Sequence, residues 1–299
     1  MFQRINILKH FFYFYPNILS VLVLRLILFI ILFTLSGQSV FSQKEIDTKK
    51  RHPKLNDKFQ FEVGVFFPTK SVEFSANGST PNDMIDFSET FDFNNNEITP
   101  QFGFKWLYSK KWYLSVEYFS IKNSHKLELQ EDISFGDVVF KEGSYVKGGF
   151  KLNLFRIFTG RSFYKSQKSE FGGGLGIHLL NVGPYIEGEV RINENETSFE
   201  QVNLTTNAPL PNLGIWYYFS PGAKWLINTN LDWFGVNIGE FYVDLWDISA
   251  GINYQVLKNM GIYATYRFYK FNAGVNENYW DGRFSFKFNG PAFGLTANF

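Results

Sequence analysis

The sequence predicts an all-β fold, an antiparallel up-and-down transmembrane β-barrel of about ten strands. Segments of alternating apolar and polar residues recur from residue 58 to the end. Aromatic residues make up 20% of the chain, although its mean hydropathy is slightly negative at −0.15. The last segment, Arg283–Phe299, alternates and ends on phenylalanine. Lipid cannot satisfy an open sheet edge, so we expect this last strand to pair with the first.

The first 42 residues read as a signal peptide. Basic residues precede an apolar run at positions 26–35, and small residues stand at positions 40 and 42, where signal peptidase reads the chain. We expect cleavage before Gln43. A retained membrane helix is the alternative, but Arg25 interrupts the longer apolar stretch and leaves it short for a span.

The region after the expected cleavage divides at residue 58. Residues 43–57 are charged and carry no periodic pattern, which predicts a periplasmic N-terminal tail. The barrel domain is predicted to cover residues 58–299. Its first strand has a period of two, and strand side chains alternate between faces. The set predicted to face lipid is Phe59, Phe61, Val63, Val65 and Phe67, and the set predicted to face the lumen is Gln60, Glu62 and Gly64.

The same alternation recurs in six further stretches, at positions 101–106, 112–118, 171–179, 225–233, 247–254 and 262–268. Two more stretches, 147–163 and 210–219, are less regular. In the first of these, the facing of residues around Leu154 is ambiguous. Together with the first and last strands, these segments give a count of ten, which satisfies the even number that such barrels require.

The connections between these segments alternate in length, as in outer-membrane barrels with short periplasmic turns. The pattern places both termini on the periplasmic side. Eight or twelve strands would need one hairpin merged or split. The predicted short turns are 109–111, 165–168, 220–222 and 258–260, and the predicted longer connections are 69–95, 132–143, 192–207, 235–240 and 272–279. Strands longer than the 9–11 residues that cross a membrane predict extension beyond the outer leaflet.

The last strand contains a change of parity. Phe284, Phe286 and Phe288 are even-numbered, whereas Phe293 and Leu295 are odd-numbered. Both sets can face lipid only if one residue is extra between them. Gly290 and Pro291 lie at that point, and both residue types mark bulges in strands. We therefore expect a β-bulge at residues 289–291.

Ionisable residues gather at positions predicted to face the lumen. Charges in a narrow interior must pair or stay hydrated. Acids and bases roughly balance, which is compatible either with a structural salt-bridge network that fills the barrel or with a narrow polar pore. The predicted lumen network consists of Glu62, Lys105, Glu117, Arg156, His178, Asp232, Asp247 and Arg267.

Little in the sequence indicates catalysis or a cofactor. There is no cysteine, and the formal net charge of +1 implies no nucleic-acid partner. His125 and His178 lack the neighbours that a serine hydrolase or an aspartate-type protease requires. The acidic connections match no metal-binding motif. We therefore expect no catalytic residue, no metal ligand and no cofactor.

Several stretches carry a resemblance to known proteins. They are DISFGDVVFKEGSYV (132–146), NAPLPNLGIWYYFSP (207–221), LDWFGVNIGEF (231–241), GINYQVLKNMGIYATYRFYKFN (251–272) and the terminal FNGPAFGLTANF. The chain resembles a family of uncharacterised Gram-negative outer-membrane β-barrel proteins over most of residues 58–299. The resemblance implies the barrel, but it brings no substrate and no catalytic residues.

The expected location is therefore the bacterial outer membrane, as an integral protein. The expected function is structural, or surface binding through extracellular loops. A narrow small-solute channel is the second possibility and a lipid-modifying enzyme the third. The expected partners are outer-membrane lipid, lipopolysaccharide and, through the strand that ends at Phe299, the barrel-assembly machinery.

Overall fold

The computed structural model describes residues 47, 50–77, 84–86, 98–130, 133–135, 138–193, 196–203, 205–239, 241–277 and 280–299. The chain divides into two compact units, Met1–Glu45 and Ile46–Phe299. The described residues all belong to the second unit, so the predicted signal peptide lies outside them. No helix in the described part of the chain is long and apolar enough to cross a membrane.

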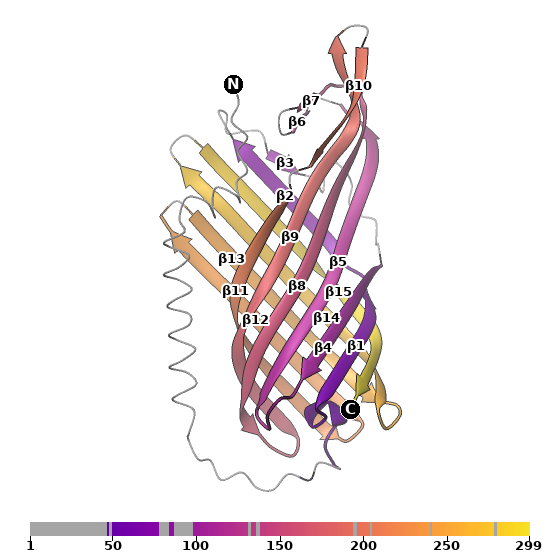
Figure 1. The fold of residues 1–299 in the computed structure, drawn as a ribbon, viewed down its shortest axis with the longest axis vertical. Coiled ribbons are helices and arrows are strands. Elements are labelled where there is room, and N and C mark those ends of the chain that lie inside the picture. The colour runs from indigo at the N-terminus through magenta and orange to yellow at the C-terminus, as the bar shows by residue number, and fades with distance from the viewer. Residues whose placement is uncertain are drawn as a thin grey trace. The chain divides into compact units, whose positions relative to one another are not determined.

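Ten antiparallel strands form the wall of a barrel (Figure 1). Each wall strand pairs with two neighbours. In order around the wall they are β1 (Phe59–Phe66), β4 (Thr99–Trp106), β5 (Trp112–Glu128), β8 (Tyr145–Lys165), β9 (Ser169–Asn193), β11 (Thr206–Gly222), β12 (Trp225–Ile238), β13 (Phe241–Gln255), β14 (Met260–Glu277) and β15 (Trp280–Asn298).

The barrel closes between its first and last strands. β1 pairs with β15 from Gln60 opposite Asn298 to Phe66 opposite Ala292. The backbone of the last residue completes the seam, because Phe59 and Phe299 exchange two hydrogen bonds of 2.8 and 2.9 Å. The predicted fold class and the count of ten strands are confirmed, and eight or twelve strands are set aside.

The two ends of the barrel differ in their connections. At one end, called here the short-turn end, β1 starts, β15 ends, and tight turns join β4–β5, β8–β9, β11–β12 and β13–β14. At the other end the predicted longer connections 235–240 and 272–279 are wrong. β12 runs to Ile238 and β14 to Glu277, so two-residue gaps remain. Gly239, with φ of +61°, supplies the left-handed conformation that the tight β12–β13 turn needs.

The predicted connection 69–95 is partly wrong, because it begins with a strand. β2 (Thr69–Asn77) pairs with the upper part of β15 and keeps the register of β1, with Thr69 opposite Asn289. Proline at position 68 has no N–H for the ladder and separates β1 from β2. A short strand β3 (Met84–Asp86) pairs with β2.

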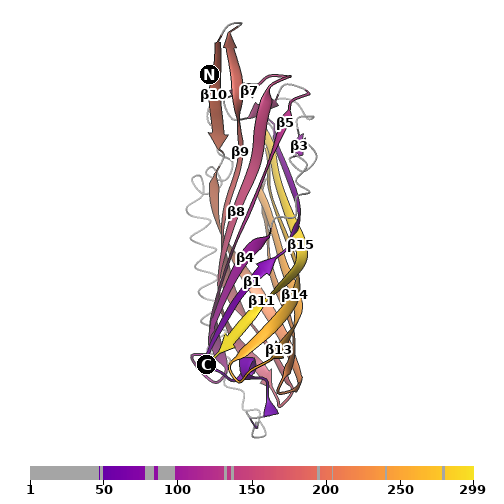
Figure 2. The same ribbon diagram turned by 90° about the vertical axis from the view of Figure 1, so that its right-hand side faces the viewer.

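Further strands lie beyond the end of the wall that is opposite the short-turn end. β6 (Ile133–Phe135) and β7 (Val138–Phe140) form a hairpin within the predicted connection 132–143. β10 (Glu196–Asn203) folds back on β9, within the predicted connection 192–207. The β9–β10 hairpin rises above the other strands (Figures 1 and 2). The predicted extension of strands is thereby seen most clearly in β9, which has 25 residues.

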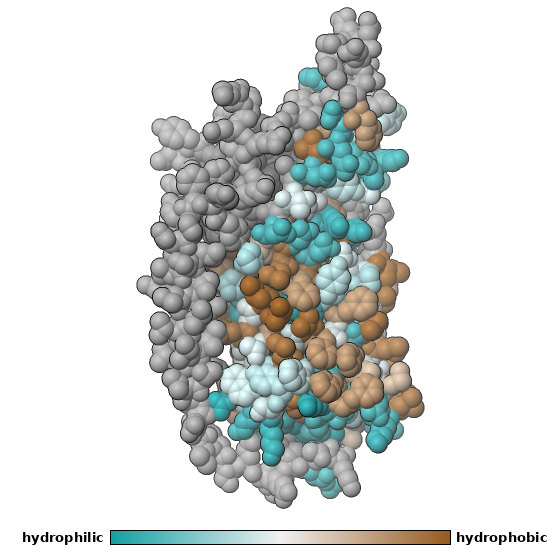
Figure 3. Space-filling view, viewed as in Figure 1, coloured by the Kyte–Doolittle hydropathy of each residue, from teal (hydrophilic) through white to brown (hydrophobic). Residues whose placement is uncertain are grey.

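The predicted alternation sorts side chains between the outside and the inside of the barrel. Val63 is 52% exposed and Leu295 55%, whereas Gln60, on the opposite face, is 2% exposed. The ambiguous stretch of β8 follows the same rule, with Leu154 and Arg156 inside. Figure 3 shows apolar residues gathered in the lower half of one face, with hydrophilic residues above and below them.

The predicted bulge in the last strand is wrong. β14 and β15 pair from Met260 to Glu277 without a register shift, and β15 also keeps one register with β1 and β2. Even-numbered residues of β15 therefore point inward from Phe284 to Asn298, and Phe284, Phe286 and Phe288 are buried inside the barrel. The parity change reflects a change in what fills the lumen.

Candidate functional site

One level of the lumen carries a cluster of charged side chains, called here the ion-pair belt. Its members come from inward positions of six wall strands, and several are direct partners across the sheet. Glu117 lies opposite Arg156, Arg156 opposite His178, and Asp232 opposite Asp247. The belt consists of Glu117 (β5), Arg156 (β8), His178 (β9), Asp232 (β12), Asp247 (β13) and Arg267 (β14).

Two arginines organise the belt. Arg156 donates to the carboxylate of Asp232 at 2.5 Å and to Glu117 at 3.0 Å. Arg267 binds Asp247 through two nitrogens, with Nε 2.8 Å from Oδ1, and its Nη1 lies 3.4 Å from Glu117. Glu117 therefore bridges both arginines. Charge-assisted hydrogen bonds of this kind are the geometry that buried charges require.

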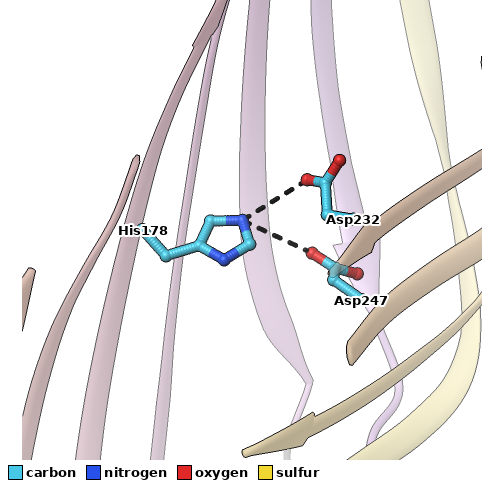
Figure 4. Close-up of side chains that lie close together, drawn as sticks. All are labelled: His178, Asp232 and Asp247. Carbon is cyan, nitrogen blue, oxygen red and sulfur yellow. Dashed lines mark ion pairs between the residues drawn. The ribbon is translucent and has the colours of Figure 1, made fainter. Parts of the chain in front are cut away.

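His178 lies against both aspartates and is fully buried (Figure 4). Its Nε2 is 3.6 Å from Oδ2 of Asp232 and 3.9 Å from Oδ2 of Asp247. Among the described residues, neither ring nitrogen has a hydrogen-bond partner. Gly214 on β11 makes room for this arrangement, because a Cβ there would lie 2.3 Å from Oδ1 of Asp232.

His178, Asp232 and Asp247 are the group in the described chain that could converge on a metal ion, since their ligand atoms lie within 4.8 Å of one another. The two Oδ2 atoms that face the imidazole are also those that accept hydrogen bonds from Arg156 and Arg267. A cation would have to displace these guanidinium groups. The donor set therefore suits an electrostatic cluster better than a metal centre.

Two of the eight predicted network residues lie elsewhere, nearer the short-turn end. Lys105 lies over the rings of Tyr113 and Tyr218, with its Nζ 4.2 and 4.9 Å from their centroids. Glu62 forms an ion pair with Lys54. Six of the predicted residues thus meet in one cluster, whereas Lys105 and Glu62 have separate partners.

A lower aromatic layer separates the belt from the short-turn end. It consists of Tyr113, Phe158, Trp216 and Tyr218, all buried. The ring of Tyr113 lies 4.8 Å from that of Trp216 and 5.9 Å from that of Phe158. The guanidinium of Arg156 lies over Phe158 at 4.4 Å, so the belt rests directly on this layer.

An upper aromatic layer covers the belt on the other side. It consists of Phe66, Phe119, Tyr269, Phe286 and Phe288, all almost fully buried. The rings of Phe288 and Tyr269 stack at 4.7 Å, and Phe288 also lies 5.3 Å from Phe119 and 5.5 Å from Phe66. The expectation of a polar lumen is therefore wrong at this level, where aromatic side chains from four strands meet.

A segment that sequence reasoning missed fills the short-turn end. Within the predicted tail, the 3-10 helix η2 (Pro53–Leu55) and the residues before it dock into the barrel, with Arg51, His52 and Leu55 buried. Arg51 forms a 2.7 Å ion pair with Glu170, and the backbone N–H of His52 donates to Ser220. This segment, Arg51–Asp57, is called here the basal plug.

Burial changes the ionisation of the basal plug. Loss of hydration lowers the pKa of His52 from its ordinary 6.5 to about 4, and the nearby Lys54 charge adds to the effect. The Nδ1 of the imidazole accepts a hydrogen bond from the backbone N–H of Lys54. Burial also lowers the pKa of Arg51, although Glu170 opposes that change. No periodic pattern announces the plug, because its contacts are with residues far away in the sequence.

No family model and no curated protein matches the chain. The solved structures that match the chain include the following three. The outer-membrane protease OmpT of Escherichia coli has a TM-score of 0.49 and 10% identity, over 81% of this chain and 97% of that one. The toluene transporter TodX of P. putida has a TM-score of 0.33 and 9% identity, over 83% of this chain and 92% of that one. Ail, the attachment invasion locus protein of Yersinia pestis, has a TM-score of 0.25 and 7% identity, over 79% of this chain and 99% of that one. Their roles differ, and likeness at this level says nothing of this chain's activity.

Proposed function

We propose that this chain is an integral barrel of the Gram-negative outer membrane whose lumen is closed and which acts through the surface that its strands raise above the membrane. The observation that carries this proposal is the filling of the lumen. The basal plug, the lower aromatic layer, the ion-pair belt and the upper aromatic layer follow one another along the interior.

The outer surface supports insertion in lipid. Exposed apolar residues run over nine positions on the longer strands, for example from Phe171 to Leu179 on β9 and from Trp225 to Trp233 on β12. That length matches the hydrophobic core of a bilayer crossed by tilted strands. A ladder of hydrogen bonds follows immediately above this apolar band. It joins Ser120, Asn153, Asn181 and Asn207 across β5, β8, β9 and β11 at 2.7 to 3.0 Å.

The filled interior argues against a channel. A pore requires a continuous hydrated path, whereas the belt is enclosed between two layers of buried aromatic side chains. An ion that entered the belt would lose hydration in both layers. A lipid-modifying enzyme would require a serine, a histidine and a carboxylate together at the outer boundary of the lipid. The described histidine–aspartate contacts lie inside the barrel, at His178.

The strands above the ladder form the surface that would bind a partner. β9 continues from Asn181 to Asn193 and carries the β10 hairpin, and β8 and β5 run beside it. These strands present paired backbone and polar side chains beyond the apolar band. An extension built from paired strands positions side chains more precisely than a loop does, which suits the binding of a surface partner.

Assembly would use the last strand. The seam between β1 and β15 has to form within the membrane, and the ring of Phe299, 60% exposed, lies beside it on the outside. We infer that the assembly machinery recognises this strand.

Planar-bilayer conductance of the refolded chain tests the closed lumen. We expect no stable conductance steps, together with a folded band on unheated gels. A variant that combines Phe288→Ala, Phe119→Ala and Trp216→Ala with removal of the basal plug opens both aromatic layers and the short-turn end, and it should conduct if it folds. Steady single-channel conductance of the unmodified chain would overturn the closed-lumen proposal and favour the small-solute channel.

A further inference from the structure

We propose that two pairs of lysines on the outer wall bind the phosphate groups of outer-leaflet lipids. The pairs are Lys122 with Lys151 and Lys270 with Lys287. This inference rests on the proposed membrane location and names the class of lipid that the barrel binds there. The occupant to which the geometry points is the phosphorylated headgroup of lipid A, the membrane anchor of lipopolysaccharide.

The first pair lies just above the apolar band. On β5 and β8, Tyr118 lies opposite Phe155, both on the outer wall. Two residues further along, Ser120 and Asn153 belong to the polar ladder. Lys122 and Lys151 are the next outward pair, directly opposite each other across the two strands, and both are exposed.

The second pair also lies just beyond an outward aromatic residue, on another part of the wall. On β14 and β15, Phe268 lies opposite Asn289, and Lys270 lies opposite Lys287 two residues further along. The Nζ of Lys287 is 5.7 Å from the ring centroid of Phe268, so the amine reaches toward the edge of the apolar band. Both lysine pairs therefore stand where acyl chains give way to headgroups.

Two like charges directly opposite each other on a sheet destabilise it. No ion pair joins any of these four lysines to a carboxylate in the described part of the chain. The contrast lies on the same wall, where Lys147 of β8 pairs with Glu187 of β9 at 2.8 Å. Among the residues that the structure describes, the paired amines thus have no carboxylate partner at the height where a lipid phosphate would supply the counterion.

The chemistry of the occupant follows from these positions. A phosphate carries charge and several acceptor oxygens, so one group can bind two facing amines. Its acyl chains would lie on the apolar side chains below, beginning with Tyr118 and Phe155. Binding by the wall rather than by a pocket requires a ligand that is already held in the membrane. A membrane lipid meets this condition.

The test compares lipids and charge variants of the full refolded chain. Wild type, K122Q/K151Q, K270Q/K287Q and the four-lysine variant are inserted into phosphatidylcholine vesicles and titrated with fluorescent diphosphorylated lipid A or with the same lipid after removal of both phosphates. K224Q/K258Q is the matched control for each pair variant, because these exposed lysines lie at the short-turn end and their loss changes the net charge as much as the loss of one wall pair.

We expect each wall pair to contribute, so that the four-lysine variant binds diphosphorylated lipid A at least about tenfold more weakly than wild type, since amines at an anionic membrane surface attract lipid phosphate. K224Q/K258Q should bind as wild type does, and all variants should bind the dephosphorylated lipid equally weakly.

The inference is overturned if the four-lysine variant keeps the affinity of wild type for diphosphorylated lipid A. It is also overturned if K224Q/K258Q loses as much affinity as the two pair variants, or if dephosphorylated lipid A binds wild type as tightly as the diphosphorylated lipid does. Insertion into phosphatidylcholine vesicles is measured first. Failure of wild type to insert would contradict the proposed membrane location itself, whereas insertion without a phosphate preference would contradict the lysine sites alone.

Discussion

Removal of Arg156 from the ion-pair belt should destabilise the barrel strongly. The guanidinium holds Asp232, whose side chain is 5% exposed, and Glu117. In Arg156→Gln both carboxylates remain, but Asp232 loses its arginine partner, whereas Glu117 keeps Arg267. Breaking a buried ion pair from one side costs about 3–5 kcal/mol, because the remaining charge stays buried without compensation. We expect the free energy of unfolding to fall by an amount in that range.

The double variant R156Q/D232N separates electrostatic coupling from lost packing. It removes both charges of the pair, so its loss should be smaller than the sum of the two single losses. Glu117→Gln serves as a control, because the Glu117 side chain is 37% exposed and should cost less than about 1 kcal/mol.

Urea unfolding in phospholipid vesicles, followed by the fluorescence of the seven tryptophans, measures these losses. Gel mobility without heating checks that each variant folds before the titration. Strictly additive losses, or an Arg156→Gln variant that is no less stable than Glu117→Gln, would refute the view that the belt holds buried charges that compensate one another.

Three further outcomes are expected. Phe288→Ala removes a fully buried ring and should cost about 3–5 kcal/mol in the same urea titration, while Phe293→Ala on the outer wall costs far less; equal losses would contradict the inward facing of Phe288. Leu295→Glu places a charge against lipid and should slow assembly and cost on the order of 1–2 kcal/mol, whereas Glu62→Gln should be tolerated, as folding yields will show. The lowered pKa of His52 leaves docking of the basal plug unaffected above pH 6.5 and weakens it as the pH falls toward 4, by up to about 3 kcal/mol, because only the undocked imidazole takes a proton in that window. A spin label on a single cysteine introduced into the plug of this cysteine-free chain should become mobile over that range, and a His52→Gln variant that shows the same change would exclude the imidazole as its cause.

The wall of the barrel could be predicted because its signal is local. Each strand alternates over its own length, and two faces in contact with different surroundings impose that period directly. The last strand shows where this reasoning fails. Phe286 inside the barrel and Phe293 outside are the same residue type, so composition assigns both to lipid. Continuity of parity from Thr296 back to Phe286 was the better guide, because a bulge requires a register shift that the pairing does not contain.

The candidate site could be predicted in part, for a related reason. Inward parity predicts that Glu117 and Asp232 face the lumen, where the ion-pair belt lies, and it leaves the facing of Arg156 open. Parity gives no height along the barrel axis. Height depends on the register between strands, which placed Lys105 one layer lower among aromatic rings. The basal plug could not be found at all. Its burial depends on partners such as Glu170, which is 119 positions away from Arg51.

The lipid that is proposed to surround the wall gives a physical reason why the interior of the barrel is filled with layers of side chains. Outward side chains of a membrane barrel exchange protein contacts for equally apolar lipid, so they add little to the cohesion of the fold. Cohesion beyond the backbone ladder must then come from inside. The belt meets this need by joining five strands through Arg156 and Arg267, and Phe288 joins opposite edges of the closing seam through Phe66 and Phe119. A hydrated pore would lose the cohesion that both the belt and the Phe288 contacts supply. The filled lumen therefore supports the proposal that the protein acts by binding at its surface.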